Sequence, residues 1–111
     1  SILDILSKLS ESNCRVNRAV VKSVTDCGCL SVHANKLQLP DQIGSFEELK
    51  QYMDSHLKGH LCPNCEEVVY NELGKLLFYV AALCNTLDIS LYDVFIKEYK
   101  KTNILGIFNM T

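Results

Sequence analysis

Apolar residues recur at helical spacing along most of the chain, and this pattern predicts four helices. The first helix is expected to run to about Ser23, and it opens with Ser1 and Asp4 spaced as in a capping box. Its apolar stripe consists of Ile2, Leu6, Leu9, Val16, Val20 and Val24. The fourth helix is expected from a second capping box, Ser90 and Asp93, to about Lys101.

The two middle helices are delimited by polar and cysteine-containing segments. The second is expected to begin at Ser45, with Glu48 reaching back, and to end at Gly59. Its predicted buried stripe is Phe46, Leu49, Met53 and Leu57. The third begins inside Cys62-Pro63-Asn64-Cys65, where Pro63 suits a first helical turn. Its apolar face extends to Leu87 and is wide, which favours a central position in a bundle.

Residues 25–44 interrupt the helical pattern. Asp26 to Cys29 predict a turn in which Gly28 takes a positive φ, and Leu30 and Val32 predict a short extended segment. The apolar tail 104–108 is expected to pack back on the bundle or against a second copy. The predicted fold class is therefore all-α, a bundle of about four helices. It forms a single domain over residues 1–111, with Cys-rich loops at 25–35 and 58–65.

The composition of the chain indicates which partners and which cellular location to expect. A chain of 111 residues with a formal net charge of -2 is one domain and gives no electrostatic reason to expect nucleic-acid binding. Its apolar runs are shorter than the roughly 20 residues that span a membrane. Because the first residues carry Asp4 and lack a basic start, we expect no signal peptide and a cytoplasmic, reducing location. A secreted, disulfide-linked domain is the alternative if a leader has been removed.

Four of the six cysteines form two closely spaced pairs. Cys27 and Cys29 make a C-x-C, and Cys62 and Cys65 make a C-x-x-C at a helix start. Two such pairs from separate segments can surround one zinc ion tetrahedrally, so these four residues are the predicted ligands of a structural zinc. Free thiols, a redox role for Cys62 and Cys65, and an iron–sulfur cluster remain alternatives.

The other cysteines and the histidines have simpler interpretations. Each of His33, His56 and His60 lies near a cysteine pair in sequence and is a possible replacement ligand. Cys14 and Cys84 lie on apolar helix faces and are expected to be buried.

The segment from Glu72 to Leu83, ELGKLLFYVAAL, followed by LDISL at 87–91, resembles the MazG-type all-α nucleoside triphosphate pyrophosphohydrolases. The resemblance covers about residues 66 to 103 and implies a MazG-like helical bundle. In that family two E-x-x-[ED] pairs hold magnesium, which clamps the triphosphate and activates water. Glu72 matches the first acid of the second pair, but Lys75 replaces its last acid. An ammonium group there would repel the cation.

The first acidic pair has no match either, since Glu11, Glu47 and Glu48 are each followed three residues later by a non-acidic residue. We therefore expect a MazG-like helical protein without hydrolase activity, acting by binding a partner, a nucleotide or its own copy, as a homo-oligomer. One alternative is a divergent magnesium-dependent pyrophosphohydrolase that uses Glu66, Glu67 and Glu72. The other is a thiol-based zinc or redox sensor.

Overall fold

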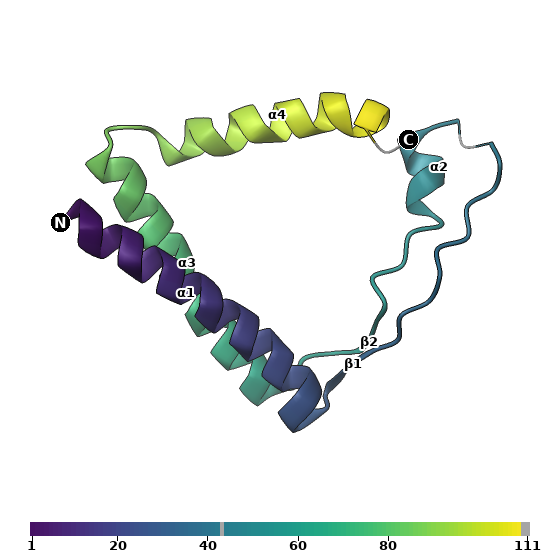
Figure 1. Cartoon of the computed structure of the whole chain (residues 1–111), viewed down its shortest axis with the longest axis horizontal. Helices are drawn as coiled ribbons and strands as arrows, with labels where there is room; N and C mark the ends of the chain where they lie inside the picture. The colour runs from purple at the N-terminus through teal and green to yellow at the C-terminus, as the bar shows by residue number, and fades with distance from the viewer. Residues whose placement is uncertain (43, 110–111) are drawn as a thin grey trace.

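The computed structural model describes residues 1–42 and 44–109, apart from the side chains of Phe46 and of residues 104–109. The chain is mostly helical, with one small two-stranded sheet (Figure 1). In chain order the elements are α1 (Ile2–Lys22), η1, a π-helical turn (Ser23–Cys27), β1 (Leu30–Val32), α2 (Phe46–Lys50), β2 (Leu57–Gly59), α3 (Pro63–Thr86) and α4 (Leu91–Asn109).

Helices α1 and α3 lie antiparallel along their length and form the centre of the structure (Figure 1). Along the contact between the two helices, less exposed positions recur at steps of three and four residues, which is the spacing of a helix-pair seam. On α1 they are Ile2, Ile5, Leu9, Ser12, Val16 and Ala19, with Ser23 following in η1, and on α3 they are Cys65, Val69, Glu72, Leu76, Val80 and Leu83. Near its end α3 is less exposed on every side, from Tyr79 to Cys84. On the exposed side of α1, Glu11 pairs with Lys8 at 3.4 Å and with Arg15 at 3.2 Å.

The helix starts follow the local caps that the sequence contains. The Ser1 hydroxyl accepts a hydrogen bond from the Asp4 amide at 3.3 Å, and Ser45 does the same for Glu48 at 3.1 Å. Ser90 accepts from the amide of Asp93 at 3.2 Å and opens α4. Each hydroxyl satisfies an amide that has no partner inside its helix.

The predicted bundle is not formed by the described residues of a single chain. Helix α4 turns away from α3, with 107° between them, and α2 stands apart beside the loop (Figure 1). The turn follows from Asp88, whose φ of 58° ends the helical path of α3. The tail 104–108 continues α4 as backbone, and the packing predicted for its side chains lies outside the described residues.

The prediction for the second helix was wrong beyond Lys50. Helix α2 has 5 residues, and β2 occupies the positions where its last turn was expected. The Asp54 carboxylate accepts from the His56 amide at 2.9 Å and the Ser55 hydroxyl accepts from the Leu57 amide at 3.3 Å, which builds a turn instead of a helix. Strand β2 then pairs antiparallel with β1, so Leu57 lies opposite Val32. Met53 and Leu57 are consequently exposed, not buried.

The length and hydropathy of the helices can be compared with the thickness of a bilayer. In the described part of the chain no single helix is long and apolar enough to cross a bilayer, although α3 and α4 up to Asn103 pass that test together as a bent pair.

Candidate metal centre

The first cysteine pair lies where α1 gives way to the hairpin. The Ser23 carbonyl accepts a hydrogen bond from the Gly28 amide at 3.0 Å, which closes the wide turn of η1. Gly28 then reverses the chain with φ at 80°, a conformation that glycine adopts without steric cost. Cys27 and Cys29 stand on either side of this glycine, so their thiols can point to the same side.

The second pair lies at the start of α3. Cys62 is the N-cap residue, and its sulfur accepts a hydrogen bond from the Cys65 amide at 3.4 Å. Pro63 follows at the first helical position, where a missing amide hydrogen costs nothing. One helical turn therefore sets Cys65 beside Cys62, next to the free amides and positive end of the helix.

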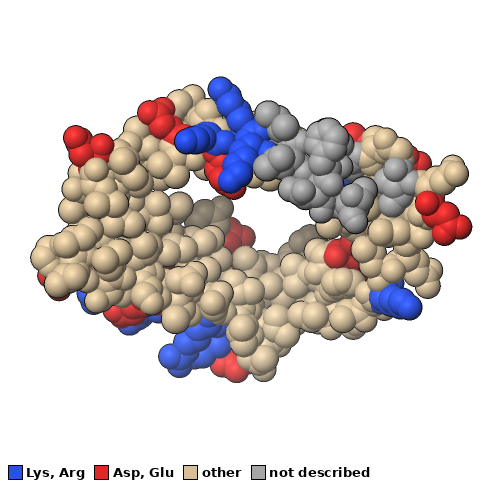
Figure 2. Space-filling view, turned by 45° about the horizontal axis from the view of Figure 1, so that its top comes forward, with Lys and Arg blue, Asp and Glu red and all other residues tan. Residues whose placement is uncertain are grey.

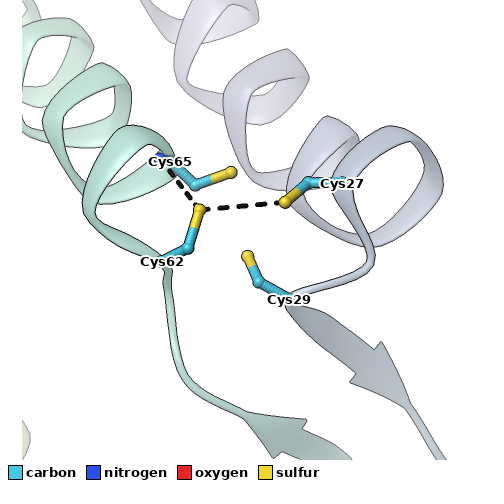
Figure 3. A group of neighbouring side chains, drawn as sticks. All are labelled: Cys27, Cys29, Cys62 and Cys65. Atoms are coloured by element: carbon cyan, nitrogen blue, oxygen red, sulfur yellow. Dashed lines mark hydrogen bonds between the residues drawn. The ribbon is translucent and has the colours of Figure 1, made fainter.

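The antiparallel α1–α3 pair brings these two ends together. All four sulfurs lie within 4.8 Å of one another, and Figure 3 shows them converging from η1, the residue before β1 and the start of α3. The sulfurs of Cys27 and Cys62 are 3.7 Å apart. Four sulfurs about 2.3 Å from a tetrahedral zinc ion are separated by about 3.8 Å from one another. The Cys27–Cys62 distance matches this edge, and the other sulfurs lie close enough for all four to hold one metal ion.

Small side chains allow the two helix ends to approach each other. Ser23 is almost fully buried at the end of the seam, and its hydroxyl donates to the Ala19 carbonyl at 3.0 Å. Ala19 is buried one turn earlier. A larger residue at either position would push α3 and its cysteines away from η1.

Gly59 provides a second close approach, between β2 and the first cysteine pair. Its φ is 89°, and a Cβ added to it would collide with the carbonyl oxygen of Cys29. The hairpin joins the backbone of Cys29 to the segment that leads into Cys62, through the pairing of Leu30 with Gly59. Sequence analysis assigned Gly59 to a helix end, and neither it nor Ser23 was recognised as part of the site.

The thiols differ in acidity. The hydrogen bond from the Cys65 amide, with a second contribution from the Cys65 thiol, lowers the pKa of Cys62 to about 7. A hydrogen bond with Ser23 lowers the pKa of Cys65, but the adjacent Cys62 and partial burial outweigh it and raise that pKa to about 12. The site therefore has one thiol that ionises near neutral pH, and its negative charge opposes ionisation of its neighbours.

The three histidines lie outside the cluster. The His56 Nδ1 accepts a hydrogen bond from the Asn35 amide at 3.1 Å, and the His33 Nε2 lies 3.1 Å from the Ser31 hydroxyl. His60 is exposed, and among the described residues the cysteines alone form a group with ligand spacing. Of the remaining cysteines, Cys84 is buried as predicted, whereas Cys14 is exposed because it faces away from the α1–α3 seam.

The three glutamates that were candidate magnesium ligands do not converge on one site. Glu66 and Glu67 are exposed on the first turns of α3, and Glu72 lies on the seam that faces α1. One oxygen of Glu72 is buried without a hydrogen-bond partner. Over residues 1–42 and 44–109, no group of three or more acids with ligand spacing is found. Lys75 is exposed on α3, one helical turn beyond Asn71.

No protein-family model, no curated protein and no solved structure matches this chain.

Proposed function

We propose that this chain is a helical binding protein whose fold is fastened by one structural zinc ion on Cys27, Cys29, Cys62 and Cys65. The observation that carries the proposal is the convergence of four sulfurs within 4.8 Å. A relation to MazG-type helical proteins, without their hydrolysis, belongs to the same proposal and rests on the sequence motif of α3. So does a reducing, cytoplasmic location, which would keep the four thiols free to bind metal.

The spacing favours a single ion over an iron–sulfur cluster. In a cluster the four cysteines are divided among two or four iron atoms, so sulfurs on different irons stand farther apart than they do around one ion. The 3.7 Å between Cys27 and Cys62 matches an edge of a tetrahedron around one ion, and it is too long for a disulfide. Four cysteine ligands also close the coordination sphere, which is typical of structural zinc and leaves no open position for a substrate.

The small core explains why a metal is needed. Among the residues that the structure describes, the buried apolar ones are Ala19, Leu30, Leu49, Val69 and Cys84. Side chains of this number and size supply little hydrophobic stabilisation, and small domains of this kind depend on a staple. The metal would join the last turn of α1 to the first turn of α3 and tie the hairpin to both.

Elemental analysis of the purified protein tests the proposal. We expect one zinc per chain in the wild type and little or none in Cys62→Ser. Cys14→Ser is the matched control, because Cys14 is an exposed cysteine on α1 outside the cluster, and it should retain the metal. Protein without metal, in which all six thiols react equally with an alkylating reagent, would overturn the assignment.

A nucleotide assay separates binding from catalysis. With magnesium and a panel of nucleoside triphosphates, we expect binding of a nucleotide or no interaction, and no release of pyrophosphate. Pyrophosphate release that disappears in Glu72→Gln would show that the hydrolase alternative is correct.

One observation favours redox sensing as a second function. The Cys62 thiol has a pKa of about 7 and lies 3.7 Å from the sulfur of Cys27. A peroxide would oxidise the Cys62 thiolate to a sulfenic acid, releasing an alcohol or water. The Cys27 thiol would then form a disulfide with Cys62 and release water, and zinc would leave. Zinc retention under mild peroxide would exclude this function.

A further inference from the structure

A single chain exposes far more surface than a compact protein of its mass. Its accessible surface is 8950 Å² for 12.5 kDa, whereas a compact folded monomer of that mass exposes about 6,200 Å². The radius of gyration is 18.0 Å, against about 13 Å for a compact chain of this length. The excess is roughly 2,700 Å² per chain. Figure 2 shows an opening through the molecule.

The face of α3 that points away from α1 carries several of the exposed large apolar residues. Tyr70, Leu77 and Phe78 lie there with exposed fractions of 70%, 61% and 66%. Gly74 lies among them and a Cβ would meet nothing within 4 Å, so the face is hollowed at this point. The resulting open groove has a volume of about 440 Å³ and is lined by aromatic residues, Gly74 and two polar residues: Tyr70, Phe78, Tyr79, Asn71 and Lys75. A soluble monomer rarely leaves a contiguous apolar face of this kind uncovered.

Helix α4 leaves a second apolar face uncovered. Leu91, Phe95 and Tyr99 follow one another at steps of four residues, and Phe95 is 66% exposed. Tyr92 is 71% exposed beside them. Asp93 and Lys97 lie on the opposite side of the helix, Lys100 and Lys101 lie on its flanks, and Glu98 lies beside Leu91 on the apolar side.

The area and the charges favour a second copy of this chain as the partner. Stable interfaces bury about 800 Å² per partner, and obligate homodimers bury up to about 2,500 Å² per partner, which is close to the excess found here. One chain carries both an uncovered groove on α3 and an uncovered apolar side on α4. In a two-fold dimer, α4 of each copy would cover the α3 groove of the other copy, so the same contact would form twice.

The charges at the ends of the two faces agree with this pairing. If the partner's α4 lies antiparallel on α3 with its start beside Phe78, the rise of about 1.5 Å per residue places Lys100 and Lys101 near Glu66 and Glu67. Opposite charges then meet at the edge of an apolar contact, which is the usual arrangement of a protein interface.

We propose that the chain forms a two-fold dimer in which α4 of each copy packs in the groove on the outer face of the partner's α3. The dimer completes the helix bundle that one chain leaves open, and it does not depend on the identity of the metal or on any catalytic activity.

Sedimentation of the wild type and of three variants tests the dimer. The wild type should sediment at twice the 12.5 kDa of one chain at about 100 µM. Leu77→Glu and Phe95→Glu should each sediment as monomers, because each places a charge in the apolar contact. Val21→Glu is the matched control: Val21 is an exposed apolar residue on the face of α1 opposite the seam, so the variant should remain dimeric. A monomeric wild type, any other mass, or dimers that survive Leu77→Glu would overturn the proposal.

Zinc content and helical circular dichroism show whether each variant is folded. A second measurement uses only the wild type and so applies even if the variants unfold. Helix α4 has little support within its own chain, and we therefore expect its amide hydrogens to exchange faster when the protein is diluted below the dimer dissociation constant. Exchange rates in α4 that are independent of concentration would contradict the dimer.

Discussion

Replacing Gly59 by alanine tests how closely the hairpin must approach the proposed metal centre. Two glycines near the site have similar backbone conformations, with φ of 89° at Gly59 and 80° at Gly28. Alanine in this region costs about 1–2 kcal/mol, because its Cβ approaches the following carbonyl. The two positions differ in their surroundings. A Cβ at Gly28 meets nothing within 4 Å, whereas a Cβ at Gly59 collides with the Cys29 carbonyl oxygen.

The collision adds a second cost at Gly59 alone. Non-bonded atoms of this kind need about 3.5 Å, so β2 must retreat from Cys29 by roughly 1 Å. Zinc ligands tolerate displacements of only about 0.2 Å, so the strain falls on the metal-bound arrangement. Overpacking of a tight contact costs about 1–3 kcal/mol. If this extra cost falls on the metal-bound state, zinc should bind about 5- to 150-fold more weakly to Gly59→Ala than to Gly28→Ala.

Competition with a chelator of known affinity measures this difference directly, at fixed pH and in a reducing buffer. Gly28→Ala is the control for backbone strain, since it shares the φ region but not the collision. Equal zinc affinities for the two variants would refute the close approach of β2 to Cys29.

Three further outcomes follow from the seam and the thiols. Ser23→Leu should lower the free energy of unfolding by about 1–3 kcal/mol and weaken zinc binding, because the seam at Ser23 has no room for a larger side chain. Denaturant titration with and without a chelator measures both effects. Glu72→Leu should raise the free energy of unfolding by about 1 kcal/mol, since it removes a buried oxygen that has no hydrogen-bond partner. Glu67→Gln, on the exposed side of α3, should leave the free energy of unfolding almost unchanged, and thermal melts compare the two variants. The number of protons that zinc displaces from the metal-free protein should rise by about one as pH falls through 7, because Cys62 is a thiolate above its pKa of about 7 and a thiol below it. Calorimetry in buffers of different ionisation enthalpy counts these protons, and a step near pH 8.5 would indicate an ordinary thiol instead.

The sequence was informative where structure is set by near neighbours. Ser1, Ser45 and Ser90 each predicted a helix start, and each caps one, because a cap needs only the next few amides. Gly28 took the predicted positive φ for the same local reason. The two cysteine pairs could be found from their spacing alone, since each pair is built by a single turn of chain.

The errors arose where distant segments decide the outcome. Leu57 continued the helical spacing of Leu49 and Met53, yet it lies in β2, because pairing with β1 across the loop outweighs a five-residue helix. The seam positions of Ser12 and Ser23 were not predicted, since small polar residues interrupt an apolar pattern and look like surface residues. Cys14 was expected to be buried for the opposite reason, because it stands beside apolar residues that face another way.

X-ray absorption at the zinc edge of the purified protein tests the central claim most directly. The convergence of Cys27, Cys29, Cys62 and Cys65 predicts four sulfur neighbours at about 2.3 Å and no nitrogen or oxygen in the first shell. A first shell that contains nitrogen or oxygen, or protein that carries no zinc at all, would contradict it.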